Sequence, residues 1–120
     1  MAKTTNDLLP LTPVVFHVLL ALADGRCHGY AIAQEVEKQT EGRVRMGPGT
    51  LYGSLQRMCD MELIKESRRE GDAVGRGERR RYYKMTPFGR KVLQAETQRL
   101  SEVVSFATTK VNLGEAGIGK

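Results

Sequence analysis

The sequence has 120 residues, of which 40% are hydrophobic, and this size fits one domain with one modest core. Lys and Arg outnumber Asp and Glu by 19 to 14, which gives a formal net charge of +5. This positive balance favours a polyanionic partner such as nucleic acid. Because so short a domain buries a small share of its surface, a second subunit would stabilise it, and we expect a dimer.

Cysteine usage and the N-terminal sequence predict a cytoplasmic protein without a metal centre. Cys27 and Cys59 form no CxxC pair and have no cluster of His or Cys beside them to complete a zinc site. The polar N-terminal stretch lacks the apolar segment of a secretory signal. The longest apolar run, at residues 14–23, is interrupted by His17 and is too short to span a bilayer, so it predicts a buried helix.

Three helices are predicted in the first half of the chain. Thr12-Pro13 is a cap followed by a first-turn proline and Asp24-Gly25 is a stop signal, so the first helix is expected over residues 13–23. The second, over residues 29–40, has a narrow apolar stripe and ends at Glu41-Gly42. The third is expected over residues 50–61, because the glycine- and proline-rich segment before it can launch a helix but cannot lie inside one.

The third predicted helix has one apolar side and one polar side. With about 100° of rotation per residue, Leu51, Leu55 and Met58 fall together and are assigned to the core. The opposite side carries Gly53, Gln56, Arg57 and Asp60. This helix therefore has one face for the core and one face free for a partner.

A charged hairpin is predicted over residues 65–84. The segment has a glycine-bearing centre, which indicates two short strands joined by a flexible tip. In the second strand Arg81, Tyr83 and Met85 share one face, whereas the other face carries Arg80, Tyr82 and Lys84. One of these two faces is expected to lie on the core.

A long last helix is predicted to follow the cap Thr86-Pro87. Apolar residues recur along it at helical spacing, which is typical of a helix that packs on a partner. The predicted dimer interface consists of Leu93, Leu100, Val103, Val104, Ala107 and Val111, with Phe106 broadening the stripe. Residues 1–85 thus form the first unit and 86–113 the dimerisation helix, and the glycine-rich residues 114–120 are expected to be a flexible tail.

The positive charge is concentrated in and around the hairpin. Residues 62–91 contain ten basic and five acidic side chains, and this local excess of five positive charges equals the formal net charge of the whole chain. A basic hairpin after a helix with a free polar face is typical of a winged helix-turn-helix, in which a helix enters the major groove and a wing follows the phosphates. The predicted fold class is therefore mainly α with a small β-hairpin. A solvated hairpin beside an ordinary amphipathic helix stays open as the alternative.

Catalysis has little support in the sequence. His17 and His28 have no carboxylate or nucleophile at an informative spacing, so we predict no enzyme and no cofactor. Residues 47–50 superficially resemble a phosphate-binding loop but lack the GxxxxGK[ST] spacing. The free N–H groups at the start of the third helix still suit a DNA phosphate.

Five segments, taken in order and spacing, resemble the PadR family of transcriptional regulators over about residues 12–100. They are residues 28–32 (HGYAI), 47–52 (GPGTLY), 63–64 (LI), 80–86 (RRYYKMT) and 89–90 (GR). The likeness is to the short form of the family, a winged helix-turn-helix with one C-terminal dimerisation helix. It implies a repressor that binds a palindromic operator in double-stranded DNA as a homodimer.

The resemblance also implies which residues contact DNA. Tyr30 approaches the phosphate backbone, and the wing contributes Arg76, Arg79 and Arg80. The third helix contributes Pro48, Gly49, Thr50, Tyr52, Ser54 and Arg57. The helical wheel alone supports Gly49, Thr50 and Arg57; it places Tyr52 on the flank, where a core-edge role is an equal alternative, and Ser54 near the core side.

Regulation and two further interpretations stay open. Some members of the family stack aromatic effectors at the dimer interface, but this sequence has no Trp and its last helix offers only Phe88 and Phe106. A small-molecule effector is therefore an open expectation. The long apolar stripe also fits a winged-helix module that docks a protein without binding specific DNA. Redox sensing through Cys27 or Cys59 is a minor alternative to incidental thiols.

Overall fold

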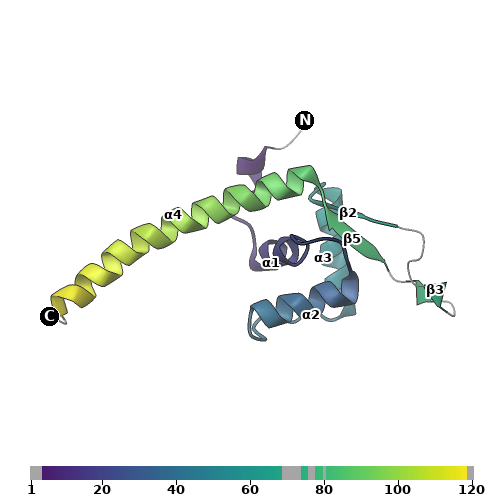
Figure 1. Ribbon diagram of the computed structural model, residues 1–120, viewed down its shortest axis with the longest axis horizontal. Coiled ribbons are helices and arrows are strands. Elements are labelled where there is room, and N and C mark those ends of the chain that lie inside the picture. The colour runs from purple at the N-terminus through teal and green to yellow at the C-terminus, as the bar shows by residue number, and fades with distance from the viewer. Residues whose placement is uncertain (1–3, 69–73, 76–77, 80, 119–120) are drawn as a thin grey trace.

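Four α-helices, a short 3₁₀ turn and two small antiparallel sheets form the described part of the chain (Figure 1). The computed structural model describes the backbone of residues 4–68, 74–75, 78–79 and 81–118, and the side chains of residues 4–68 and 81–112. The helices are η1 (Thr5–Leu8, a 3₁₀ turn), α1 (Pro13–Ala21), α2 (Gly29–Gln39), α3 (Pro48–Asp60) and α4 (Pro87–Ile118). The strands are β1 (Cys27–His28), β2 (Ile64–Glu66), β3 (Val74–Gly75), β4 (Glu78–Arg79) and β5 (Tyr82–Met85).

The main sheet has the order β1-β5-β2 and is antiparallel throughout. Strand β5 lies in the centre, with Tyr83 opposite Cys27 on one side and opposite Glu66 on the other. The two predicted strands of the hairpin are confirmed as β2 and β5. Strands β3 and β4 form a separate two-stranded pair farther out. Sequence reasoning missed β1, because two residues are too few to show an alternating pattern.

One core joins the helices to the sheet. Its buried side chains are Val18, Leu19, Leu22, Ile32, Val36, Leu51, Leu55, Met58, Leu63, Ile64, Tyr83, Val92 and Leu93. This set confirms the apolar face predicted for the third helix. It also shows which face of the second hairpin strand lies on the core, because Tyr83 is buried while Lys84 is exposed. Each fully buried Leu or Ile contributes about 1.5–3 kcal/mol to folding.

The predicted helix caps are confirmed, with one shift of a helix start. Thr12 Oγ1 accepts the N–H of Val15 at 3.3 Å, and Thr86 Oγ1 accepts the N–H of Gly89 at 2.9 Å. Helix α3 begins at Pro48, two residues before the predicted start at Thr50. A proline is tolerated there because first-turn N–H groups have no partner within the helix.

The far end of α4 and one of its predicted interface residues require correction. The helix continues to Ile118, so the flexible tail expected from residue 114 is wrong for residues 114–118. A glycine costs a helix about 1 kcal/mol relative to alanine, but extending an existing helix needs no new nucleation. Leu93 is 7% exposed and packs in the hydrophobic core, so its side chain is not free for the predicted dimer interface.

Candidate nucleic-acid interface

Helix α3 presents an exposed polar face and an uncapped N-terminus. Pro48, Gly49 and Thr50 are all exposed, and no side chain caps this end of the helix. The positive end of the helix dipole and its first N–H groups therefore face solvent, which suits an anion. Farther along, Arg57 is exposed on the side opposite the buried Leu55 and Met58.

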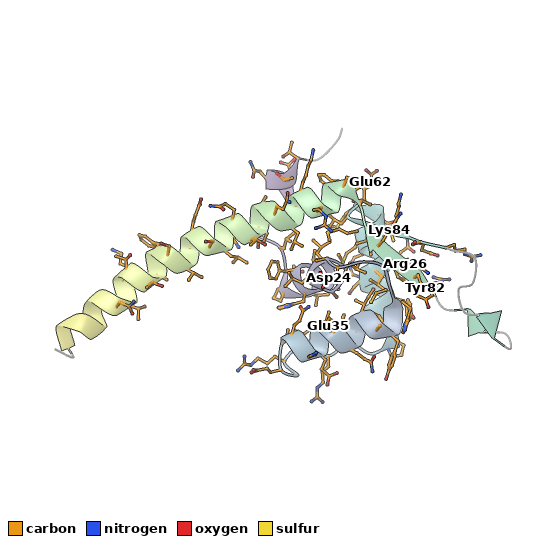
Figure 2. All side chains as sticks on the ribbon, viewed as in Figure 1. Asp24, Arg26, Glu35, Glu62, Tyr82 and Lys84 are labelled. Carbon is orange, nitrogen blue, oxygen red and sulfur yellow. The ribbon has the colours of Figure 1, made fainter. Side chains whose placement is uncertain are left out.

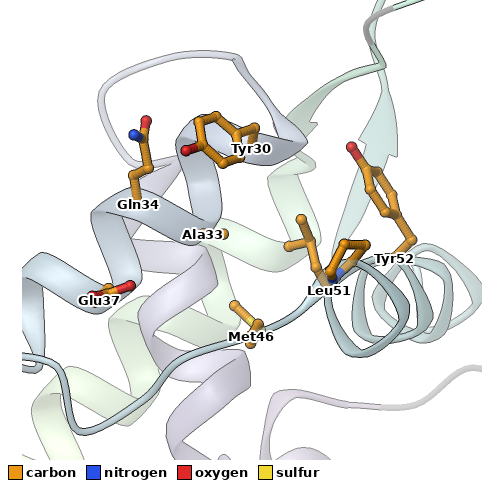
Figure 3. A pocket seen from close by; sticks show the side chains of 8 residues that line it. Tyr30, Ala33, Gln34, Glu37, Met46, Leu51 and Tyr52 are labelled. Atoms are coloured by element: carbon orange, nitrogen blue, oxygen red, sulfur yellow. The ribbon is translucent and has the colours of Figure 1, made fainter.

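The start of α2 lies beside the start of α3, and an apolar pocket of about 330 Å³ separates them (Figure 3). Tyr30 borders the pocket from α2 and Tyr52 borders it from α3, with Met46 and Leu51 in its wall. Tyr30 is 65% exposed and Tyr52 is 39% exposed. Two of the predicted contact residues thus lie on one surface.

The ring of Tyr52 lies against the backbone of α2. A Cβ atom built on Gly29 would stand 2.7 Å from Tyr52 Oη and 2.9 Å from Cε1. Real Cβ atoms almost never make contacts that short. One side of the Tyr52 ring therefore packs on the start of α2, as a core-edge role requires, and the rest of the ring is exposed.

Ser54 is the one predicted contact in α3 that the structure contradicts. It is 4% exposed, because it lies on the side of the helix that turns toward the core. Arg57 Nη2 donates a hydrogen bond to Ser54 Oγ at 3.2 Å. Ser54 thus holds Arg57 in place, while Arg57 is the side chain that reaches solvent.

The root of the wing is fixed by contacts that the sequence did not reveal. Arg26 lies over the ring of Tyr82, with 4.3 Å from Cζ to the ring centroid (Figure 2). The ring of His28 meets the same tyrosine edge-on, at 5.6 Å between centroids. His28 Nδ1 accepts the N–H of Ala31 at 3.2 Å and so caps α2. These contacts tie β5, where the wing returns to the sheet, to the first turn of α2.

Arg81 stands where the wing enters β5. Its side chain is exposed, and interaction with the hydroxyl of the buried Tyr83 raises the pKa of Arg81. Burial raises the pKa of Tyr83 above its ordinary value, so this hydroxyl stays protonated at neutral pH. Of the predicted wing contacts, Arg76 and Arg80 lie outside the described residues, and Arg79 is placed only by its backbone in β4.

The described residues form neither a metal site nor a membrane-spanning helix. No group of three or more His, Cys, Asp or Glu side chains in that part of the chain is arranged to hold a metal ion. Among the described helices, none is both long and apolar enough to cross a membrane.

Comparison with known families identifies the chain. The model of the transcriptional regulator PadR-like family matches residues 18–95, from the middle of α1 to the third turn of α4. The chain belongs to the PadR-like family. The resemblance seen in the sequence is thereby confirmed. Members of the PadR-like family are transcriptional regulators, which also confirms that the chain is not an enzyme.

Two relatives with curated sequences support this membership in the PadR-like family. A transcriptional regulator of Mycobacterium tuberculosis is 36% identical over 75% of this chain and 78% of its own length. An uncharacterised protein in a transposon of Streptomyces fradiae is 40% identical over 82% of this chain. The match covers 24% of that protein, so the present chain spans about a quarter of its length.

Solved structures of the PadR-like family confirm the winged-helix fold. A PadR family regulator of Clostridium difficile superposes with a TM-score of 0.65 at 24% identity, covering 83% of this chain and 98% of that one. PadR of Bacillus subtilis, solved in complex with operator DNA, superposes with a TM-score of 0.59 at 18% identity. That match covers 70% of this chain and 46% of the Bacillus protein.

The exposed apolar stripe of α4 lies past the end of the PadR-like match at residue 95. Val103 is 48% exposed, Val104 61%, Phe106 66% and Val111 64%. Ala107 is exposed too, and Leu100 is half-buried. Except for Leu93, the predicted interface residues therefore have surface free for a partner.

Proposed function

We propose that this PadR-like protein is a repressor that binds a palindromic operator as a homodimer. In this proposal α3 enters the major groove and the wing follows the phosphate backbone. The observation that carries it is the shared surface of α3 and α2, on which Pro48, Gly49, Thr50 and Tyr30 are exposed beside an uncapped helix N-terminus. The Bacillus subtilis relative solved with operator DNA supports the same assignment.

Each proposed contact has a physical role. Gly49 and Thr50 offer N–H groups to a phosphate, and Tyr30 approaches the backbone from α2. Arg57 is the long cation on the exposed face of α3, and its anchoring by Ser54 reduces the freedom it would lose on contacting a guanine edge. Arg76, Arg79 and Arg80 of the wing supply phosphate contacts that do not depend on sequence.

The homodimer is proposed from the exposed stripe of α4. Four of the six large hydrophobic side chains that are exposed in the described residues are Val103, Val104, Phe106 and Val111. A second copy of α4 packed along this stripe would remove them from water. A two-fold dimer presents two copies of α3, which is why the operator is proposed to be palindromic.

Release of the DNA by a small-molecule effector is the last part of this proposed function. Phe88 is half-buried and packs against the core, so Phe106 is the aromatic side chain that α4 offers at the proposed interface. A single ring of this kind suits a small apolar or aromatic compound. Such a compound would act by changing how the two α4 helices pack, and with them the spacing of the two α3 helices.

Selection from random duplexes, followed by mobility shifts across a salt series, tests this function. We expect selected sequences with two inverted half-sites about one helical turn apart, and retardation that weakens steeply as salt rises. A protein that retards no duplex at low salt would contradict the proposal. Capture of a folded protein partner through α4 together with absent DNA binding would favour the docking module instead.

A further inference from the structure

Gly29 is the point where the three elements of the proposed DNA surface meet. It is the first residue of α2 and is buried. The ring of Tyr52, from α3, lies against its Cα atom, so that Tyr52 Oη, Cε1 and Cζ would all stand within 3.0 Å of a Cβ atom there. On the other side, the N–H of Gly29 donates to the carbonyl oxygen of Arg81 at 3.2 Å, at the entry to β5.

The contacts around Gly29 hold α2, α3 and β5 in one arrangement. His28, the preceding residue, pairs with Tyr82 of β5 in the sheet and also caps α2. The Tyr52 ring then occupies the space that a side chain at residue 29 would need. The obstruction involves the ring atoms Cε1 and Cζ as well as Oη, so a side chain at residue 29 requires the whole Tyr52 ring to move.

We propose that Gly29 is a positioning residue, and that its missing side chain sets the orientation of α3 relative to β5, the strand at the root of the wing, by letting the Tyr52 ring pack on α2. Tyr52 thereby acts on DNA recognition through its packing. This inference rests on the proposed DNA-binding function, because orientation matters only if α3 and the wing contact one duplex. A bulkier residue 29 displaces the ring and misaligns the two contact elements.

Fluorine NMR tests the packing without DNA. The chain has four tyrosines and no tryptophan, so 3-fluorotyrosine gives four resonances, which single Tyr→Phe variants assign. We expect Gly29→Ala to move the Tyr52 resonance more than that of Tyr30 or Tyr83. Gly47→Ala is the matched control, because a Cβ atom there meets nothing within 4 Å. An unchanged Tyr52 resonance in folded Gly29→Ala overturns the proposal.

A double-mutant cycle on operator affinity tests the consequence for recognition. We expect Gly29→Ala to weaken operator binding about tenfold in the natural background, and much less in a Tyr52→Leu background that has no ring to displace. Non-specific duplex affinity at low salt should change less, because phosphate contacts tolerate small misalignments. An equal loss in both backgrounds overturns the proposal.

The outcomes separate this inference from the function on which it rests. If the natural protein binds no duplex, the proposed function fails, while the fluorine spectra still decide whether Gly29 positions the ring. If Gly29→Ala fails to fold, the combined Gly29→Ala and Tyr52→Leu variant should recover a cooperative unfolding transition. A combined variant that is as unfolded as Gly29→Ala overturns the proposal.

Discussion

Arg99 donates two hydrogen bonds to Glu96, from Nε to Oε1 at 2.6 Å and from Nη2 to Oε2 at 2.9 Å. Oε2 also accepts the backbone N–H of Leu11 at 3.0 Å. Glu96 is only 2% exposed, so these bonds offset the cost of removing the carboxylate from water. One side chain of α4 thereby fastens the segment that precedes α1.

The first prediction concerns acid stability. Hydrogen bonds from Arg99 lower the pKa of Glu96 below its ordinary value of 4.5, although burial acts in the opposite direction. Since the folded pKa is the lower one, Glu96 contributes stability that is complete above the ordinary value and is lost as the pH falls through the folded value. Urea unfolding at several pH values should show that Glu96→Gln loses free energy of unfolding at pH 7 and that the difference from the natural protein shrinks toward pH 3.

Glu102→Gln is the control for this pH dependence. Glu102 lies on the same helix, is exposed, and accepts a hydrogen bond from Gln98 at 2.9 Å. An exposed carboxylate of this kind contributes little, so its variant should follow the natural protein at every pH. A Glu96→Gln variant that is as stable as the control at pH 7 would contradict the assigned role.

The second prediction compares two glycines. A Cβ atom at Gly89 would collide with the carbonyl oxygen of Leu63, which is backbone and cannot rotate away. At Gly53, inside α3, the nearest atom would be Arg57 Nη1 at 3.7 Å, an ordinary contact. Urea denaturation should therefore show that Gly89→Ala lowers the free energy of unfolding by at least about 1–3 kcal/mol. Gly53→Ala should instead raise the free energy of unfolding by up to about 1 kcal/mol, because alanine has the higher helix propensity. Equal effects would show that the close approach at Gly89 is not rigid.

The large elements of this fold could be predicted from sequence because each leaves a periodic signal. Leu51, Leu55 and Met58 repeat at helical spacing, and Thr12-Pro13 and Thr86-Pro87 mark helix starts by their chemistry. The alternation of the second hairpin strand also placed Tyr83 and Lys84 on opposite faces, and the structure shows that the face of Tyr83 is the buried one.

The contacts that shape the site could not be predicted in the same way, because they join residues far apart in the chain. Arg26 lies over Tyr82, and Gly29 faces Tyr52, yet neither pair has a spacing that reveals it. Leu93 continues the α4 stripe by periodicity, but the first turns of that helix pack on the hydrophobic core. A stripe shows which face is apolar without showing which partner covers it.

The third prediction concerns the two thiols. Burial raises the pKa of Cys27, with a further contribution from Glu35, and burial raises the pKa of Cys59 together with Glu66 and Asp60. Both cysteines are free thiols. Because their pKa is raised, they are mostly protonated at neutral pH, whereas the thiolate is the reactive form. Alkylation at pH 7 should be slower than for a free thiol, and mild oxidant should leave duplex affinity unchanged. A reversible loss of affinity after oxidation would restore the redox interpretation.

The fourth prediction separates base reading from phosphate binding. Arg57→Ala should weaken binding to the selected operator by about 1–3 kcal/mol of binding free energy and relax the sequence preference at one base pair. Arg79→Ala should weaken all duplexes about equally and reduce the slope of affinity against salt by about one. Lys91→Ala, which removes an exposed cation from α4, is the control for charge alone. If Arg57→Ala and Lys91→Ala have the same small effect, Arg57 reads no base.

The fifth prediction concerns the proposed dimer seam. Val104 is 61% exposed in the single subunit, so Val104→Asp leaves the core of that subunit untouched. In a dimer joined through α4 the same change buries an unpaired charge, and we expect it to cost about 3 kcal/mol or more of association free energy. Light scattering after size-exclusion chromatography, over a range of concentrations, should show a shift from dimer to monomer.

Thr109→Asp is the matched control for the seam, because Thr109 is exposed and lies on the opposite side of α4 from Val104 by the helical wheel. It adds the same charge to the same helix and should leave the dimer intact. Circular dichroism then shows whether the Val104→Asp monomer keeps its helices, which distinguishes lost association from lost folding. A Val104→Asp protein that stays dimeric at low concentration would place the interface elsewhere, because a buried aspartate at the centre of the seam is incompatible with close packing of two α4 helices.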